Sequence, residues 1–394
     1  MWCFKKLVAV FGSLAIISSL VVPNSAIAAT KPKPGAACSK LASTSVLGKV
    51  RYTCVKKGKK LIWDSGKPVA PAPVKSVPAS PETTQKPSLD MLDTKAVYDT
   101  SRAEVWFQIA RNSAVATNVK YFVGKNVEES MVSLIKKDLA SAIGLWATKV
   151  TKDDDVSVIW YTQPDLEWAK SKYLELTDNP ISASNINSSC TLTYCGGATA
   201  TVTNKGALVF EQGMKHNPDG WNRSTSAHEY THLAQYKTSN RKVYAMPLWL
   251  KEGSAQFYGE AVGYSPLGKQ ASIRRGMHTQ FARDAEDAVA TAFNGLKVKE
   301  VLAAGVTADA VKIMTLLEAR QGNSSLTGLA YLLGSYASEV LVAVYGQEKM
   351  VELYESFSTS ENWEANFSKV YGVSTAHFYG KLAPYFKAIS AELE

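Results

Sequence analysis

Histidine and cysteine are both scarce in this chain, with only five of each among 394 residues. Two of the five histidines, His228 and His232, nevertheless lie four positions apart. Long apolar runs are also scarce: after Leu7–Val22 we expect no segment to be apolar enough to span a membrane. No internal repeat is evident. In so histidine-poor a chain, two histidines at this spacing are an unusual feature.

The first 28 residues have the composition of a secretory signal peptide. Lys5 and Lys6 form a positively charged start, and the apolar run Leu7–Val22 follows. Ala26-Ile27-Ala28 then has the small residues typical of a signal-peptide cleavage site. We expect cleavage after about Ala28 and a secreted or cell-envelope-associated protein. A retained membrane anchor is the alternative.

Four cysteines remain after the signal peptide, in two local pairs: Cys38 with Cys54, and Cys190 with Cys195. An even number of cysteines in an exported chain predicts disulfides. A metal site is the alternative for the second pair.

Acidic residues are almost absent from the segment that follows the signal peptide. Residues 29–68 hold ten Lys and Arg residues and one acid, Asp64, which gives this segment a net charge of +9. The alternation in Val50–Val55 and the apolar Leu61–Trp63 predict two strands. A segment of this length buries only a small hydrophobic core. We therefore expect residues 29–66 to be a small β module that a disulfide between Cys38 and Cys54 stabilises.

The charge of this module suggests a partner. A basic patch attracts anionic surfaces, and for an exported protein we expect an anionic cell-envelope polymer rather than nucleic acid. Simple solubility is the alternative explanation of the charge. Residues 29–89 could also serve as an inhibitory leader instead of a targeting module.

A proline-rich linker is predicted at residues 67–89, followed by one large domain at residues 90–394. Its first part mixes strands and helices. The strands are predicted at 119–123 and 156–161, with a hairpin at 199–202 and 207–210 and helices at 128–150 and 164–176. The second part is predicted to be mainly helical, with helices that include 224–237, 248–262, 269–294, 326–345 and 374–392.

The strongest chemical signal is His228-Glu229-Tyr230-Thr231-His232, a His-Glu-x-x-His pattern. On a helix its two histidines lie on one face and can bind one metal ion, while Glu229 can hold a water molecule beside it. A chance occurrence anywhere in the chain has a probability of roughly 0.3%. Trp249-Leu250-Lys251-Glu252-Gly253 then offers Glu252 as a third ligand, and two histidines with one carboxylate are typical of catalytic zinc.

These two motifs, with Tyr331-Leu332-Leu333-Gly334 and Tyr345-Gly346-Gln347-Glu348-Lys349 downstream, resemble the gluzincin metallopeptidases, in particular small bacterial peptidase-MA-like domains. The resemblance implies an α+β, zincin-like domain with a small mixed sheet and a mainly helical C-terminal lobe. It implies one zinc ion bound by His228, His232 and Glu252, with Glu229 as general base. It also implies Tyr331 as the donor to the developing oxyanion, with Tyr336 as the alternative.

The chain departs from that group in two places. Gly206–Glu211 lacks the amine-binding motif of the aminopeptidases, so specificity for a free N-terminus is not carried over. Gln256 stands where thermolysin-like members have a carboxylate that supports a ligand histidine, so this support must be neutral or come from elsewhere. We expect His278 and His377 to be surface or packing residues.

The function expected from the sequence is therefore an exported zinc peptidase acting on peptides or proteins, with the strand Ala207–Phe210 aligning the substrate. The alternative is a cell-envelope-binding protein that uses the basic module and carries a weakly active or inactive metal domain.

Overall fold

The computed structural model describes residues 32–47, 50–68, 86–112, 118–179, 186, 190–191, 195–214, 222–264, 268–319 and 324–393. Backbone contacts divide the chain into two units, Met1–Glu82 and Thr83–Glu394. The predicted signal peptide and most of the predicted linker lie outside the described residues. Within them the chain is mostly helical with two small sheets, which confirms the α+β prediction.

The first unit contains a small antiparallel sheet centred on β2 (Val50–Lys57). Three strands pair with β2: β1 (Thr44–Leu47), β3 (Lys60–Trp63) and β4 (Lys67–Pro68). The predicted Cys38–Cys54 disulfide is present, and Cys54, a residue of β2, is fully buried. Lys67 and Pro68, which the sequence assigned to the linker, belong to this sheet through β4.

The second unit opens with α1 (Thr94–Asn112) and a four-stranded sheet in the order β5-β6-β8-β7. The strands are β5 (Val119–Val123), β6 (Val156–Tyr161), β7 (Ala198–Val202) and β8 (Leu208–Gly213). The first three strands in that spatial order run parallel, and β7 runs antiparallel to β8 at the edge. The bounds predicted for β5 and β6 are confirmed.

Helices cover both faces of this sheet, which explains why every residue of β6 and β8 is buried. Ile159 and Val209 pack with α3 (Leu166–Thr177) on one face. Val158 and Phe210, one position away along the strands, face the large core shared with α2 (Glu129–Trp146) and α5 (Asn222–Thr238). The sheet therefore supports α5, the helix that carries the His-Glu-x-x-His motif.

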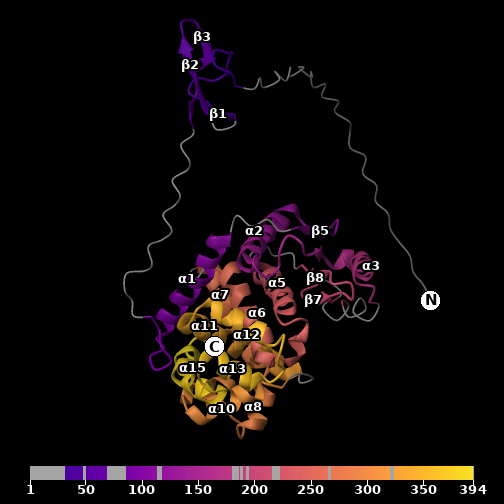
Figure 1. Cartoon of the computed structure of the whole chain (residues 1–394), viewed down its shortest axis with the longest axis vertical. Coiled ribbons are helices and arrows are strands. Elements are labelled where there is room, and N and C mark those ends of the chain that lie inside the picture. The colour runs from indigo at the N-terminus through magenta and orange to yellow at the C-terminus, as the bar shows by residue number, and fades with distance from the viewer. Residues whose placement is uncertain are drawn as a thin grey trace, which may run out of the picture. The chain divides into compact units, whose positions relative to one another are not determined.

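The remainder of the second unit is helical (Figure 1). The four strands of this unit and α3 lie at the opposite end of the unit from α8, α10, α13 and α15. After α5 come α6 (Leu248–Gly263), α7 (Gly268–Asp284), α8 (Glu286–Ala292), α9 (Val298–Ala304), α10 (Thr307–Leu316), α11 (Ser324–Tyr345), α12 (Gln347–Ser356), α13 (Trp363–Tyr371), α14 (Thr375–Lys381) and α15 (Ala383–Ser390).

Two sequence expectations about helices are wrong, and one helix was not predicted. The single helix expected at residues 269–294 is two helices, which meet at Ala285. The helix expected at 374–392 is also two, because Pro384 occupies the first turn of α15 and lacks the N–H that would continue α14. The α1 helix was not expected at all.

The expectation that no late segment is apolar enough to span a membrane is also wrong. Residues Leu326–Tyr345 of α11 meet the criterion for a spanning helix in length and composition. Most of this segment is buried inside the second unit, where α11 packs on α6, α1 and α7. Its apolar composition is that of a core helix surrounded on several sides.

Candidate metal centre

The α5 helix is fixed at its first turn and along its middle by side chains of α2. The Arg223 guanidinium donates two hydrogen bonds of 2.7 Å to the carboxylate of Asp138. Trp146 donates a hydrogen bond of 3.1 Å from its indole Nε1 to Thr231 Oγ1. Because these bonds are largely buried, they set the position of the helix along which His228 and His232 are spaced.

Glycines allow α6 to approach α5 closely. A Cβ built on Gly259 would lie 2.6 Å from the Ser224 carbonyl oxygen, and one built on Gly263 would lie 2.5 Å from that of Arg223. Both distances are shorter than any side chain tolerates, so only glycine fits at these positions. The resulting contact brings Glu252, near the start of α6, within reach of the α5 histidines.

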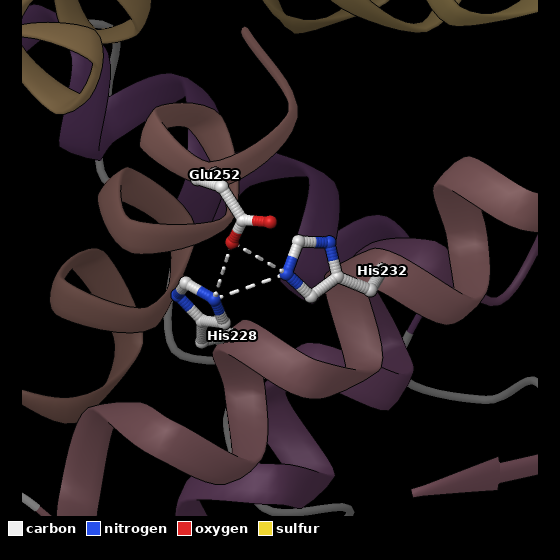
Figure 2. Close-up of side chains that lie close together, drawn as sticks. All are labelled: His228, His232 and Glu252. Carbon is white, nitrogen blue, oxygen red and sulfur yellow. Dashed lines mark hydrogen bonds and ion pairs between the residues drawn. The ribbon is translucent and has the colours of Figure 1, made fainter. Parts of the chain in front are cut away.

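His228, His232 and Glu252 converge on one point (Figure 2). The two histidine Nε2 atoms are 3.1 Å apart, and Glu252 Oε2 lies 3.6 Å from His228 Nε2 and 3.2 Å from His232 Nε2. The edges of a tetrahedron with metal–ligand bonds of about 2.1 Å measure about 3.4 Å. All three residues are buried, and this group could bind a metal ion.

Further polar contacts orient the ligands. Gln235, three residues after His232 on α5, pairs its Oε1 with His232 Nδ1 at 2.8 Å. Its Nε2 donates to the Lys251 carbonyl oxygen at 2.9 Å and to Ser254 Oγ at 3.1 Å. The sequence predicted that such support must be neutral or come from elsewhere than residue 256. The neutral Gln235 supplies this support to His232. Its position three residues after His232 on a helix was the feature of the sequence that could have predicted the contact.

Lys251 contacts the other oxygen of the Glu252 carboxylate, with Nζ 2.9 Å from Oε1. This leaves Oε2 as the oxygen that faces the histidines. Burial alone would raise the pKa of Glu252, but His232, His228 and Lys251 together lower it well below its ordinary value. Glu252 is therefore held as a carboxylate, the form that binds metal.

Glu229 and Tyr331 border the same site. Both line, with His228, a cavity of about 230 Å³. Burial raises the pKa of Glu229, which makes it a better proton acceptor than an exposed carboxylate. The charge of Glu252, with burial and Glu229, raises the pKa of Tyr331 well above its ordinary value, so the phenol keeps its proton. A ring-centroid distance of 5.5 Å separates Tyr331 from His228.

Tyr336 lies elsewhere, because its hydroxyl pairs with His278 Nδ1 at 2.9 Å and it is not among the residues that line the cavity. His278 is 2% exposed and also pairs with Glu260, so it is a buried polar residue and not a surface one. His377 is exposed on α14.

The sheet differs from the sequence expectation at the substrate-aligning strand. Residues 208–210 belong to β8, which is fully buried between β6 and β7. The edge strand is β7, and Gly196, Gly197 and Ala198 at its start line the cavity. Ala207–Phe210 therefore cannot pair with a substrate, whereas β7 is the edge strand beside the cavity among the strands that the structure describes.

The second predicted disulfide, Cys190–Cys195, is confirmed and immediately precedes this edge strand. Two disulfides favour an oxidising compartment over the cytosol.

Comparison with known protein families, with curated proteins and with solved structures gave no match to this chain.

Proposed function

We propose that this chain is an exported zinc-dependent peptidase of the gluzincin type. The observation that carries the proposal is the convergence of His228, His232 and Glu252 beside a cavity that Glu229 and Tyr331 also border. Two imidazoles and one carboxylate suit zinc, whereas magnesium and calcium prefer ligand sets made of oxygen alone. The disulfides and the predicted signal peptide support export.

The residues around the site have separate roles in the proposed hydrolysis. A bound zinc ion supplies positive charge that lowers the pKa of a water molecule and polarises a peptide carbonyl. Glu229 accepts a proton as the water oxygen attacks the carbonyl carbon, and delivers it to the leaving amine nitrogen as the C–N bond breaks. Tyr331 donates a hydrogen bond to the carbonyl oxygen as that oxygen gains negative charge.

The edge strand β7 supplies a means of aligning an extended substrate. Among the described residues no further strand pairs with its outer edge, so its backbone can add a peptide as a further strand, which would run beside the cavity from Gly196 onward. This role passes to β7 from the Ala207–Phe210 strand expected from the sequence.

The test is hydrolysis of casein and of a peptide library by the mature chain and by the Glu229→Gln variant, with zinc measured in both. We expect cleavage by the native chain, a loss of at least 10²-fold in Glu229→Gln, and equal zinc contents. Equal zinc with no cleavage by either protein would contradict peptidase activity on those substrates.

A second candidate function rests on the first unit, which would bind an anionic cell-envelope polymer. The described lysines and arginine of its sheet region are exposed: Lys33, Lys40, Arg51, Lys56, Lys57, Lys59, Lys60 and Lys67. The sole acid, Asp64, accepts backbone hydrogen bonds from Thr53 at 2.9 Å and Gly66 at 3.0 Å, which lower its pKa. Its charge is thus engaged within the module, and the basic surface is left for a partner.

The test of this candidate is binding of the full chain to polyglutamate at low and high salt. We expect binding that weakens with salt and is lost when Lys56, Lys57, Lys59 and Lys60 are replaced by glutamate. Unchanged binding by that variant would exclude the module as the binding surface.

A further inference from the structure

Gln256 occupies a position that the proposed hydrolysis does not use. It lies on α6 four residues after Glu252, and therefore one turn along the same helix face. Its side chain is 6% exposed and lines the cavity together with His228 and Glu229. A polar side chain in this place can contact whatever the cavity holds.

The orientation of the Gln256 amide is fixed by an ionised neighbour. Gln256 Nε2 donates a hydrogen bond of 2.8 Å to Glu260 Oε1. Arg274 Nε donates to Glu260 Oε2 at 2.6 Å, and His278 Nε2 lies 2.6 Å from Glu260 Oε1. These partners lower the pKa of Glu260 far below its ordinary value, so it is a carboxylate that can only accept. Only the NH₂ end of Gln256 can face it.

The amide oxygen of Gln256 must then point elsewhere. The second N–H direction is also used, since Nε2 lies 3.7 Å from Met277 Sδ. Within the described part of the chain, no residue donates a hydrogen bond to Gln256 Oε1, nor is this oxygen one of the polar atoms sealed from solvent without a partner. The cavity is the space that this side chain lines, so the oxygen is an acceptor available there.

Behind Gln256 lies a group of buried charged residues of opposite sign. Glu260 and Glu339 are matched by Arg274 and Arg102: Arg274 Nη2 lies 4.0 Å from Glu339 Oε2, and Arg102 also pairs with Glu339. These residues join α1, α6, α7 and α11. Turning the amide over would put its oxygen against the Glu260 carboxylate, which such a network strongly disfavours.

The rest of the cavity wall indicates what this acceptor meets. Apart from His228 and Glu229 of the site itself, the lining residues are uncharged, with Met277 and Phe281 forming an apolar part and Ser224 and Thr225 a polar part. Among the described lining residues Glu229 is the one acid and the proposed reaction uses it, and none is a lysine or an arginine, so these residues offer a substrate side chain no further counter-ion. The volume of about 230 Å³ is below the roughly 300–1,000 Å³ of pockets for drug-sized ligands and suits one amino-acid side chain.

We propose that Gln256 is a specificity-determining residue that accepts a hydrogen bond from an uncharged N–H or O–H donor on the substrate side chain held in this cavity. The preferred substrates are peptides with a carboxamide or hydroxyl side chain at that subsite. This inference rests on the proposed peptidase function.

The experiment compares peptides that differ only by glutamine or methionine, which have similar length, at each position around the scissile bond. The measured quantity is the ratio of kcat/KM for the glutamine peptide to that for the methionine peptide. We expect the native chain to prefer glutamine at one subsite and Gln256→Met to lower this ratio about tenfold. The matched control is Gln280→Met, since Gln280 is exposed on α7 and pairs with Asp284.

A ratio that stays the same in Gln256→Met, or a native chain with no glutamine preference, would overturn the inference while leaving the peptidase proposal intact. Thermal melting reports whether Gln256→Met is folded. If it is not, Gln256→Leu gives the same kcat/KM ratio as the readout.

Binding of the same peptides by calorimetry, in the Glu229→Gln background, gives a readout that does not need turnover. Discrimination there that depends on Gln256, without cleavage by the native chain, would show that Gln256 selects the bound peptide but would contradict the peptidase function on which the inference rests. Absence of both binding and cleavage would overturn both proposals.

Discussion

Gly253 on α6 and Gly334 on α11 are in direct backbone contact: a Cβ built on Gly253 would lie 2.3 Å from the Gly334 Cα atom. A Cβ on Gly334 would likewise lie 2.3 Å from the Trp249 carbonyl oxygen. Gly253 directly follows Glu252, and Gly334 lies one helical turn after Tyr331. The two glycines therefore let α6, which carries Glu252, meet α11, which carries Tyr331. This contact places Tyr331 beside the site.

We expect Gly334→Ala to destabilise the second unit by about 1–3 kcal/mol, because the added methyl group forces α6 and α11 apart. The melting temperature should fall by several degrees, measured by calorimetry at constant zinc. Gly276→Ala is the matched control, since Gly276 is helical and has open space around its Cβ position. This control should be neutral or stabilise the protein by up to about 1 kcal/mol. Equal effects of the two substitutions would exclude the close contact as the cause.

Gln235→Leu should weaken zinc binding by about 10–100-fold, because His232 loses the partner of its Nδ1 atom. Competition with a chromophoric chelator measures the dissociation constant. Gln280→Met, at an exposed residue that pairs with Asp284, should bind zinc as the native chain does. Native affinity in Gln235→Leu would mean that packing alone orients His232.

Tyr331→Phe should lower kcat by about 10²–10³-fold while zinc content is retained, since the variant lacks only the hydroxyl that donates to the oxyanion. Tyr336→Phe is the matched control: its hydroxyl pairs with His278 away from the cavity, so kcat should fall much less. A greater loss in Tyr336→Phe than in Tyr331→Phe would reverse the assignment of the two tyrosines.

Glu211 on β8 gives the protein a pH-dependent stability. It is fully buried, its Oε2 accepts a hydrogen bond of 2.7 Å from the Tyr161 hydroxyl, and burial raises its pKa from 4.5 to about 8. Between these pH values the folded chain retains a proton that the unfolded chain has released. The free energy of unfolding therefore falls as pH rises through this window, by at most about 1.4 kcal/mol per pH unit.

Glu211→Gln removes this titration and keeps the shape of the side chain. Urea unfolding at pH 5, 7 and 9 should show that the variant gains stability relative to the native chain as pH rises. A constant difference between the two proteins across this range would contradict a buried, protonated Glu211.

The sequence was most informative where structure depends on local pattern. The apolar runs of β5 and β6 set their bounds, and the spacing of His228, His232 and Glu252 was enough to predict that they come together. The α1 helix escaped prediction because its buried face includes Ser101, Gln108 and Asn112, so it has little apolar periodicity.

Long-range pairing explains the error about the substrate-aligning strand. The hairpin β7–β8 was visible in the sequence, but which strand is exposed depends on the parallel pairing of β8 with β6. That pairing joins residues about fifty positions apart and leaves no local signal. The buried network behind Gln256 was hidden for the same reason, since it joins α1 to three helices far along the chain.

The most direct test of the metal centre is the zinc content of the purified mature chain, measured by elemental analysis beside the His228→Ala/His232→Ala double variant. A His377→Ala variant serves as control, because His377 is an exposed histidine on another helix. We expect one zinc ion per native chain, one in the control and none in the double variant. A native chain without zinc, or a double variant that retains it, would mean that His228 and His232 do not form a zinc site.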